Sequence, residues 1–425
     1  MTLRRLVVRN TGVQMATTTA SLGISFVTTA ILSRYLGVEW FGKFNYLFAF
    51  FGVFLSLNDF GVNTIVVREV SQARPLAGEI IGAMLPFKVF LALVSLVAAW
   101  ITIALMHFPD ELRDGLRIFS LILPITALQL PALIYQVKLT LGRLALLTFL
   151  IKSVVGSLLL MGVVVLGARL RTLAAACVLA EGLFLLMVLA DTGWLVRPVI
   201  RWDPKRWQQI LRPSVTIGIT GLFGAVINQV DFMLLERLTD MRQVGLFAAA
   251  NKVINFLEAF PLMVMGTLYP VLSRYASAHP QRLRSLYAKS VLGMGAVALP
   301  MGLCITLCAP RIIRLLFGTQ FLGAERGLAI LIWATVCLYM AIVGGTLLIS
   351  MGYERINLIL NMFGAAISVA LNLWLIPTQG FMGAAWAMAA TYLFLLIGTS
   401  IMAHRILRRA EEAPERAHDH QGGVT

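Results

Sequence analysis

Charged side chains inside long apolar stretches are the residues of this chain with the clearest capacity for chemistry. Three lysines, Lys88, Lys152 and Lys252, fall inside such stretches, and an ammonium group can bind phosphate or carboxylate oxygens. A charge at the centre of a membrane costs about 2.5–3.5 kcal/mol on insertion scales, so each lysine requires a function or a partner. Lys152 lies about eight residues inside its stretch, or about 12 Å along a helix, which favours substrate binding.

The other candidate cations lie nearer the ends of their stretches, and two interpretations are open for each. Lys88 and Lys252 stand about five or six residues from an end, where a long side chain either reaches the membrane surface or binds an anion. Arg34 and Arg237 stand at the ends of two stretches, where anchoring at the interface is the alternative to substrate binding. The candidate substrate-binding residues are therefore Lys152, Lys88, Lys252, Arg34 and Arg237.

Four carboxyl side chains also fall within or near apolar stretches: Asp59, Glu181, Asp231 and Glu258. A carboxyl group at such a depth is protonated, paired or in contact with water, so these residues are candidates for ion coupling or gating. Structural ion pairs are the alternative, because Glu181 matches Lys152 in depth and Asp231 matches Lys252. Asp59 belongs to a turn-like Asn58-Asp59-Phe60-Gly61 sequence, which indicates a cap or a gate.

The composition places these charges in a membrane protein. Of the 425 residues, 59% are hydrophobic and 13% are charged, whereas soluble domains contain about 25% charged residues. An ordinary soluble enzyme, a disordered chain and a disulfide scaffold are thereby excluded. Twelve stretches of about 20 apolar residues predict an all-α integral membrane protein with twelve transmembrane helices. The predicted spans are 11–32, 44–64, 83–106, 117–137, 144–166, 172–192, 213–235, 246–272, 286–308, 327–350, 356–377 and 381–403.

Loop charges predict the orientation of these spans. The chain carries 35 Lys and Arg against 20 Asp and Glu, a formal net charge of +15. With the N-terminus inside, the inside loops hold about 20 Lys and Arg and the outside loops about 11, so the positive-inside rule predicts that both termini are cytoplasmic. Topology and anionic lipid thus account for the basic charge, and no nucleic-acid partner is predicted.

Cysteine and glycine motifs give no sign of a cofactor. The four cysteines lie in apolar stretches and form neither a CxxC motif nor a Cys/His cluster, so no metal site is predicted. The run from Gly37 to Lys43 is spaced like a phosphate-binding P-loop, but Phe44 stands where that motif requires Ser or Thr. Hydrolase and metalloprotease signatures are absent too. The chain is therefore predicted to be a non-enzyme without a cofactor.

The two halves of the chain resemble each other. Residues 32–44 and 235–247 share leucine, arginine, glycine and phenylalanine at a constant offset of 203 residues. This offset places the first span on the seventh, as a duplication of six helices requires, and such repeats are typical of transporters. The predicted domains are a six-helix lobe over 1–204, a second six-helix lobe over 205–404 and a disordered cytoplasmic tail over 405–425.

Four short patches carry a resemblance to a known family. They are Leu36-Gly37-Val38-Glu39-Trp40-Phe41-Gly42, Asn58-Asp59-Phe60-Gly61 with Arg68-Glu69, Asp231-Phe232-Met233 with Val244-Gly245-Leu246-Phe247, and Leu375-Ile376-Pro377 with Gly380 and Gly383. With these residues the chain resembles the polysaccharide flippase family, the Wzx-like exporters of O-antigen and teichoic acid precursors. That family belongs to a superfamily that includes multidrug and toxin extrusion (MATE) transporters and the lipid II flippase.

The resemblance implies a function for the whole chain. It implies a MATE-like pair of lobes that moves undecaprenyl-pyrophosphate-linked oligosaccharide across the bacterial inner membrane by alternating access. The implied partners are this lipid-linked glycan, membrane lipids, and a glycan polymerase or glycosyltransferases of the same pathway. Cations would bind the pyrophosphate, and the hydroxyl-rich span 11–32 would contact sugars or pack on neighbouring helices. A cation-coupled MATE-type drug exporter and a membrane-bound glycan polymerase or ligase are the alternatives.

Overall fold

The computed structural model describes residues 3–138, 140–167, 169–193, 199–278 and 280–419, and every regular element within these ranges is a helix. Helices satisfy all backbone polar groups within one segment, which a bilayer requires of a spanning element. Among the described residues, ten helices are long and apolar enough to cross a membrane, or eleven if the bent pair Asp110–Leu128 and Leu130–Val137 is one span. The prediction of an all-helical, multi-pass membrane protein is confirmed.

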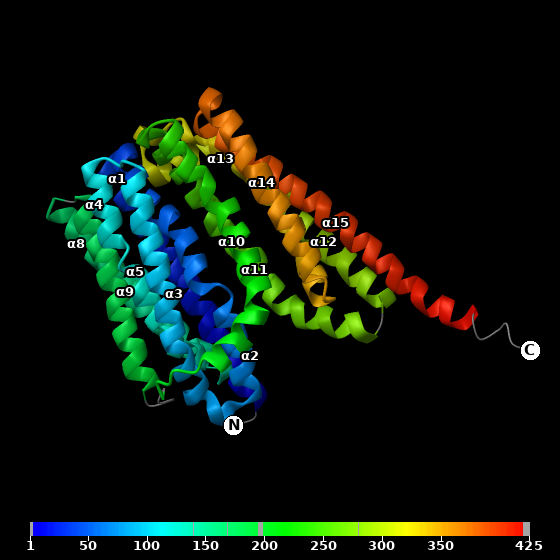
Figure 1. Ribbon diagram of the computed structural model, residues 1–425. Coiled ribbons are helices and arrows are strands. Elements are labelled where there is room, and N and C mark those ends of the chain that lie inside the picture. Colours follow the sequence, from blue (N-terminus) through cyan, green and yellow to red (C-terminus); the bar gives the residue numbers. More distant parts are fainter. Residues whose placement is uncertain (1–2, 139, 168, 194–198, 279, 420–425) are drawn as a thin grey trace, which may run out of the picture. The chain divides into compact units, whose positions relative to one another are not determined.

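The chain divides into two compact units, Met1–Ala225 and Val226–Thr425. One helix, α10 (Pro204–Leu238), continues through the boundary between them (Figure 1). The predicted lobe boundary at residues 204 and 205 stays a prediction. The last helix, α15, continues to Asp419, whereas the sequence predicted a disordered tail from residue 405. Alanine, glutamate and arginine are frequent in this segment, and all three favour helix.

The N-terminal unit begins with a helix that is too long to be one span. α1 (Leu3–Asp59) has 57 residues, which would measure about 85 Å if straight, against a hydrocarbon core of about 30 Å. Gly37 interrupts it with φ 76° and ψ 176°, a conformation that glycine adopts without steric cost. The chain end N and α2 (Val62–Gln72) lie at the same end of this unit in Figure 1, so the chain reverses direction near Gly37.

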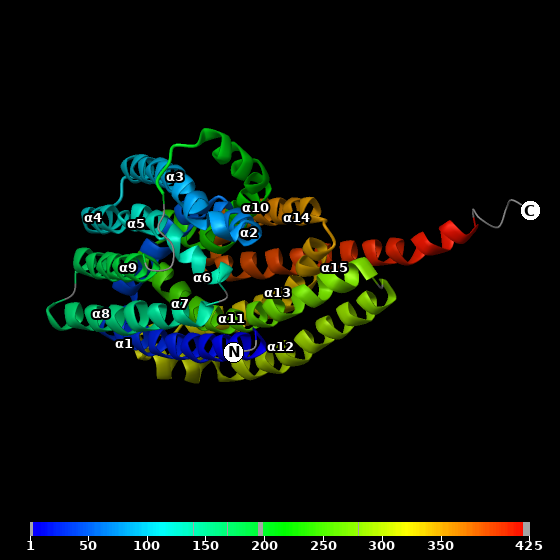
Figure 2. The ribbon, with the colours of Figure 1, turned by 90° about the horizontal axis from the view of Figure 1, so that it is seen from below.

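The rest of the N-terminal unit consists of shorter, more irregular elements. The chain passes from α2 into η1 (Arg74–Leu76) and α3 (Ala77–Leu105), and then through α4 (Asp110–Phe119), α5 (Ile122–Leu128), η2 (Leu130–Leu133), α6 (Ile134–Val137), α7 (Leu141–Thr148), η3 (Phe149–Val155), α8 (Gly156–Val165) and α9 (Leu170–Thr192). α8 contacts both α1 and α9 and lies between them in Figure 2. The span made by α7, η3 and α8 is therefore held on two sides.

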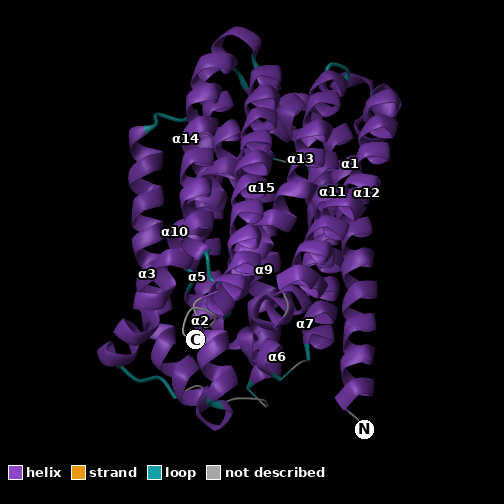
Figure 3. Cartoon of the chain, turned by 90° about the vertical axis from the view of Figure 1, so that its right-hand side faces the viewer, coloured by secondary structure: helices purple, strands orange, loops and turns teal. Residues whose placement is uncertain are grey.

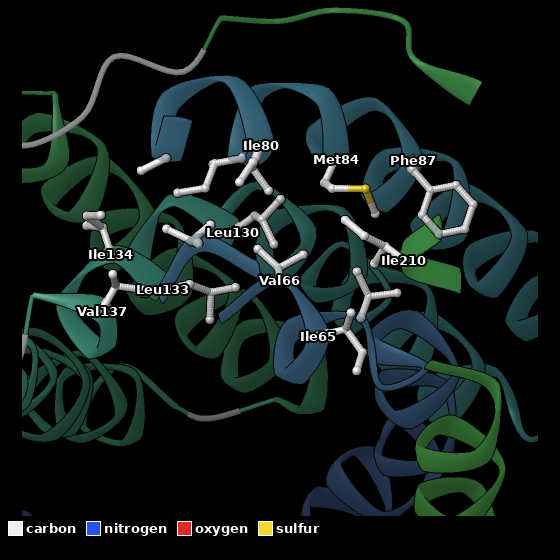
Figure 4. Close-up of a cluster of buried hydrophobic side chains, with 14 of the residues drawn as sticks. Ile65, Val66, Ile80, Met84, Phe87, Leu130, Leu133, Ile134, Val137 and Ile210 are labelled. Atoms are coloured by element: carbon white, nitrogen blue, oxygen red, sulfur yellow. The ribbon is translucent and has the colours of Figure 1, made fainter. Parts of the chain in front are cut away.

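A buried apolar cluster packs α2 against α3 and α6. Figure 4 shows Ile65 and Val66 of α2 pointing toward Ile80 and Met84 of α3, with Leu130 close by. All five of these side chains are buried. The start of α10 joins the same cluster through Ile210 and Trp207, and the indole nitrogen of Trp207 donates to the Ala83 carbonyl at 2.7 Å. The short helix α2 is thus fixed at one end of the unit.

The C-terminal unit is built around one central helix. It contains the end of α10 and then α11 (Met241–Ala278), α12 (Pro280–Phe317), η4 (Thr319–Phe321), α13 (Ala324–Ser350), α14 (Glu354–Gln379) and α15 (Phe381–Asp419). α13 packs against α11, α12 and α15, and Figure 3 shows α11 and α12 running alongside it. Its buried residues Tyr339, Val343 and Leu347 form a core with Met265 and Tyr287. This core fixes α11, which carries Glu258 and Lys252.

Candidate functional site

Lys152 and Glu181 form an ion pair inside the N-terminal unit. Lys152 stands near the middle of the apolar span Leu141–Val165, and Glu181 stands at the middle of α9. The Lys152 Nζ lies 2.7 Å from Oε1 of Glu181, and the side chains are 32% and 17% exposed. The pairing predicted as an alternative from their equal depth is confirmed. Two opposite charges thus stand together at a depth where each alone is costly.

The backbone that carries Lys152 is irregular. Residues Phe149–Val155 form a π-helix, a widened turn that interrupts the α-helical hydrogen bonding between α7 and α8. Such turns are rare and appear frequently at functional sites. The next turn of the chain contacts α1, because Thr28 Oγ1 donates to Ser157 Oγ at 2.8 Å. The π-helix is thus positioned by contacts to α1 as well as to α9.

Two further residues, neither of them predicted from the sequence, complete the surroundings of this pair. Gln129 Nε2 donates to Oε2 of Glu181 at 3.0 Å, and the Lys152 ammonium lies 4.4 Å from the centroid of the Phe184 ring. Phe184 follows Glu181 by about one helical turn, so the spacing alone places both residues on the same face of α9. Gln129 is uncharged, so its cost of insertion into a membrane is too small to single it out as a candidate site residue. We call Lys152, Glu181, Gln129 and Phe184 the Lys152 cluster.

A second ion pair joins the buried Lys88 to the half-exposed Asp59. The Lys88 side chain is 4% exposed, and its Nζ lies 3.3 Å from Oδ1 of Asp59 and 3.0 Å from the Asn58 carbonyl oxygen. The interpretation that Lys88 reaches the membrane surface is therefore wrong. α3 begins at Ala77, earlier than the predicted span, so Lys88 lies about three turns inside the helix.

The Asp59 turn is a break in the chain, as its sequence predicted. α1 ends at Asp59, and Phe60 and Gly61 adopt φ values of 42° and 73° before α2 begins. Asn58 Nδ2 donates to the Leu123 carbonyl and to Thr126 Oγ1, both at 3.0 Å. The end of α1 is thus fastened to α3 through Lys88 and to α5 through Asn58.

α10 makes backbone contact with this break. A Cβ atom added to Gly61 would lie 2.8 Å from the Ser214 carbonyl oxygen, and one added to Gly218 would lie 2.7 Å from the Phe60 carbonyl oxygen. Distances below 3.0 Å are essentially never found around real Cβ atoms. Glycine is therefore required on both sides of this crossing.

The C-terminal unit holds a separate cluster of polar side chains. Asp231 on α10 is 1% exposed and accepts a hydrogen bond of 2.5 Å from Asn372 Nδ2. Asn372 Nδ2 also donates to the Ser368 carbonyl, and the Tyr392 hydroxyl donates to Asn228 Oδ1 at 3.2 Å. Carboxylate, amide and hydroxyl oxygens are the donor types that hard cations prefer. The predicted pairing of Asp231 with Lys252 stays a prediction.

Glu258 lies on α11 with one carboxyl oxygen buried. Among the described residues, no hydrogen-bond partner is found for Oε1 of Glu258. A buried acceptor without a donor is costly, which favours a transient ligand such as a proton or a water molecule. The described residues contain no group of three or more His, Cys, Asp or Glu side chains able to hold a metal ion.

The two predicted arginines stand at the ends of helices. Arg237 is exposed in the last turn of α10, and Arg34 is exposed shortly before the break at Gly37. A cation in the last turn of a helix is stabilised by the helix dipole, so Arg237 has a structural reason for its position. Substrate binding by Arg34, Arg237 and Lys252 stays a prediction.

Comparison with known proteins gives matches over most of the chain. A family model described as polysaccharide biosynthesis protein matches residues 7–276, and the MatE model matches residues 217–374. The probable low-salt glycan biosynthesis flippase Agl15 of Haloferax volcanii is 22% identical over 391 residues, or 90% of this chain and 79% of the relative. The succinoglycan biosynthesis transport protein ExoT of Rhizobium meliloti is 23% identical over 334 residues, which are 77% of this chain and 66% of that relative.

Solved structures show the fold. The lipid II flippase MurJ in an inward closed conformation superposes with a TM-score of 0.75 at 11% identity, covering 92% of this chain and 87% of that one. The predicted fold class is confirmed to this extent: the chain has an all-helical membrane fold that it shares with MurJ and MATE proteins. The count of twelve spans and the side of the termini stay predictions.

Proposed function

Because the chain belongs to the polysaccharide biosynthesis protein family, whose members are membrane transporters and not enzymes, we propose that it is a lipid-linked glycan flippase. The predicted resemblance to polysaccharide flippases is confirmed at the level of the family. The proposed substrate is an oligosaccharide on undecaprenyl pyrophosphate, carried across the bacterial inner membrane for the synthesis of a surface polysaccharide.

The Lys152 cluster is the observation that supports this substrate. A pyrophosphate head group needs a cation within the membrane, and Lys152 presents one at mid-span with 32% of its side chain exposed. A lysine ammonium offers three donors, so the bond to Glu181 leaves it able to bind further oxygens. The buried cation Lys88 is committed to Asp59 and the Asn58 carbonyl, which makes it the weaker candidate.

The proposed topology has twelve spans and cytoplasmic termini. Counting α1 as two spans on either side of Gly37, and the bent pair as one, adds one span to the upper count of eleven. The excess of basic residues in the inside loops supports the orientation. Transport would proceed by alternating access of two lobes, 1–204 and 205–404, and the glycan would come from glycosyltransferases and pass to a polymerase.

Ion coupling is proposed for the C-terminal polar cluster. Asp231 supplies a buried carboxylate beside amide and hydroxyl oxygens, and Glu258 supplies a second carboxyl group with an unpartnered oxygen. A proton or a sodium ion bound there would link the gradient to a change of conformation, since a ligand shifts an equilibrium only through different affinity for its two states. Asp59 and Glu181 are proposed as gating residues on the basis of their ion pairs.

A MATE-type exporter of organic cations is the second candidate, favoured by the match of the MatE model. One experiment separates the two functions. Proteoliposomes containing the purified protein are given a fluorescent undecaprenyl-pyrophosphate-linked oligosaccharide in one arm and ethidium in the other. Protein-dependent movement of the lipid-linked oligosaccharide supports the proposal. Ethidium transport without movement of the glycolipid would replace it with drug export.

A further inference from the structure

We propose that Glu181 is a resident counter-ion of Lys152 which the diphosphate of the substrate displaces, and that Gln129 is the positioning residue that retains the displaced carboxylate. The proposal rests on the proposed function, because it takes the substrate head group to be a diphosphate. It assigns a role to two residues, Glu181 and Gln129, that do not themselves bind the substrate.

The carboxylate of Glu181 is held by two different partners through two different oxygens. Oε1 contacts Lys152 at 2.7 Å, and Oε2 accepts from Gln129 at 3.0 Å. Loss of the first contact therefore leaves the second in place. With only 17% of its side chain exposed, Glu181 would otherwise be left without a donor, which costs about 1–3 kcal/mol or more for a charged group. Gln129 lowers the cost of displacement.

Lys152 has a means of staying in position when Glu181 leaves. Its ammonium lies 4.4 Å from the centroid of the Phe184 ring, and Phe184 is on the same helix as Glu181. A cation over an aromatic face gains about 0.5–2 kcal/mol without any counter-ion. The ring therefore holds the ammonium while its oxygen ligands exchange from carboxylate to phosphate.

Gln129 stands at a break in the span that contains it. α5 ends at Leu128 and η2 begins at Leu130, where the bent pair of helices turns by 48°. Pro131 lacks the backbone N–H that would continue regular hydrogen bonding. A shift of the Glu181 carboxylate would pull on Gln129 through their hydrogen bond, at the point where the helix is already broken. Binding of the head group is thereby linked to the bend at Gln129.

The exchange also explains how the head group is released. A transport site must bind strongly enough to accept its ligand and weakly enough to let it leave. An unpaired lysine at this depth would hold a diphosphate without a competitor. Glu181 remains within reach of Lys152 through Gln129, so it competes for the ammonium and lowers the barrier to release. Glu181 thus weakens the binding of the head group and speeds its release.

The test measures binding and transport separately, with purified full-length protein. Binding of farnesyl pyrophosphate, a short polyprenyl diphosphate, is measured in nanodiscs, and flipping of the lipid-linked oligosaccharide is measured in proteoliposomes. Glu181→Gln removes the competing charge and keeps a side chain that can bond to Gln129. We expect about tenfold tighter binding of farnesyl pyrophosphate, a change of about 1.4 kcal/mol, together with slower flipping.

Gln129→Leu gives the opposite change in affinity. Without Gln129 the displaced carboxylate has no donor, so farnesyl pyrophosphate should bind about tenfold more weakly than to the wild type. This loss should disappear when Gln129→Leu is combined with Glu181→Gln, since no charge is then displaced. Such non-additivity identifies a coupled pair, which a purely structural role for Gln129 would not produce. If Glu181→Gln does not fold, Glu181→Ala takes its place in the same comparison, since it also removes the charge that would be displaced.

Controls separate this proposal from the function on which it rests. Glu39→Gln removes a partner of Lys43 at 3.0 Å, another ion pair of the same unit, and should change neither binding nor flipping. The double exchange Lys152→Glu with Glu181→Lys keeps an ion pair but moves the cation out of the π-helix, and should abolish flipping. Wild-type flipping by this double variant, or unchanged affinity in Glu181→Gln, would overturn the proposal. Failure of the wild type to bind and flip would overturn the proposed function itself.

Discussion

The two partners of the Lys88–Asp59 pair differ in their exposure, and this difference decides how much the loss of each residue would destabilise the fold. The Lys88 side chain is 4% exposed and that of Asp59 is 40% exposed. Removing the lysine leaves a half-exposed carboxylate that other groups can solvate. Replacing the carboxylate by a neutral amide leaves a buried cation whose oxygen partners, the Asn58 carbonyl among them, carry no charge, and an uncompensated buried charge is strongly destabilising.

The more exposed residue of this pair should therefore be the more sensitive one. Asp59→Asn is expected to lower the free energy of unfolding by about 3–5 kcal/mol, and Lys88→Met by about 1–3 kcal/mol. Thermal unfolding of the full-length protein in detergent measures both. The double variant should recover part of the loss, because it leaves no charge to compensate. A larger effect of Lys88→Met would contradict this account of the pair.

Asp231 allows a test of ion coupling at the level of one residue. Asp231→Asn removes the charge and keeps an oxygen that can accept from Asn372. Flipping in proteoliposomes should then no longer respond to an imposed sodium or proton gradient, because the ion loses its carboxylate ligand. Binding of farnesyl pyrophosphate should stay unchanged, since Lys152 lies in the other unit. Full gradient dependence in this variant would remove Asp231 from the coupling site.

Among the elements, the crossing of α10 over the break at the end of α1 is a close backbone contact that requires glycine. Gly61 and Gly218 face the backbone of the opposite segment with no room for a Cβ atom. Gly221 lies less than one turn beyond Gly218 on the same helix, and nothing lies within 4 Å of the Cβ position there. A side chain at position 218 would thus collide with the opposite backbone, whereas a side chain at position 221 would meet no neighbouring residue.

This contrast gives a matched pair of variants. Gly218→Ala should destabilise the protein by about 1–3 kcal/mol, because the added methyl group forces the two backbones apart. Gly221→Ala should be neutral or stabilising by up to about 1 kcal/mol, since alanine favours helix and meets no atom. Both are measured as changes in the thermal unfolding midpoint in detergent. Equal effects of the two substitutions would show that the crossing is looser than the structure indicates.

For the whole molecule, the arrangement of charges supports the proposed orientation. The predicted inner loops hold basic residues such as Arg201, Lys205 and Arg212 in close succession. Ion pairs occur on both predicted sides of the N-terminal unit, since Arg171 pairs with Asp114 and Arg143 pairs with Asp191. The positive-inside rule counts Lys and Arg and gives little weight to carboxylates, so the support comes from the number of basic residues in the inner loops.

Cysteine labelling in intact cells tests the topology directly. In a variant lacking the four native cysteines, Glu111→Cys should react with a membrane-impermeant maleimide added outside. Arg355→Cys, in a loop predicted to be cytoplasmic, should react only after the membrane is permeabilised. Labelling of both from the same side would contradict the predicted number of spans between them. Labelling in the reverse order would place the termini outside.

The parts of this structure that the sequence predicted are those set by the membrane itself. Long apolar runs predicted the helices, and similar depth on neighbouring spans indicated the pair Lys152–Glu181 as the alternative to separate roles for the two residues. Gln129 and Asn372 were missed because neutral polar residues are common in helices and acquire meaning only through the partner they reach. Lys88 was misjudged because its partner stands at a chain break, whose contacts depend on tertiary packing.

α10 belongs to both units, and its local composition decides how it responds to a load. Its beginning is held by the Trp207 bond to Ala83 and by the Gly218 crossing. Gly221 and Gly224 follow immediately before the boundary at Ala225, and neither has an atom within 4 Å of its Cβ position. Each glycine weakens a helix by about 1 kcal/mol, so α10 resists bending less at Gly221 and Gly224 than it would with alanine there. A torque applied to the far end of this helix would therefore meet less resistance at these two glycines than in the section held by Trp207 and by the Gly218 crossing.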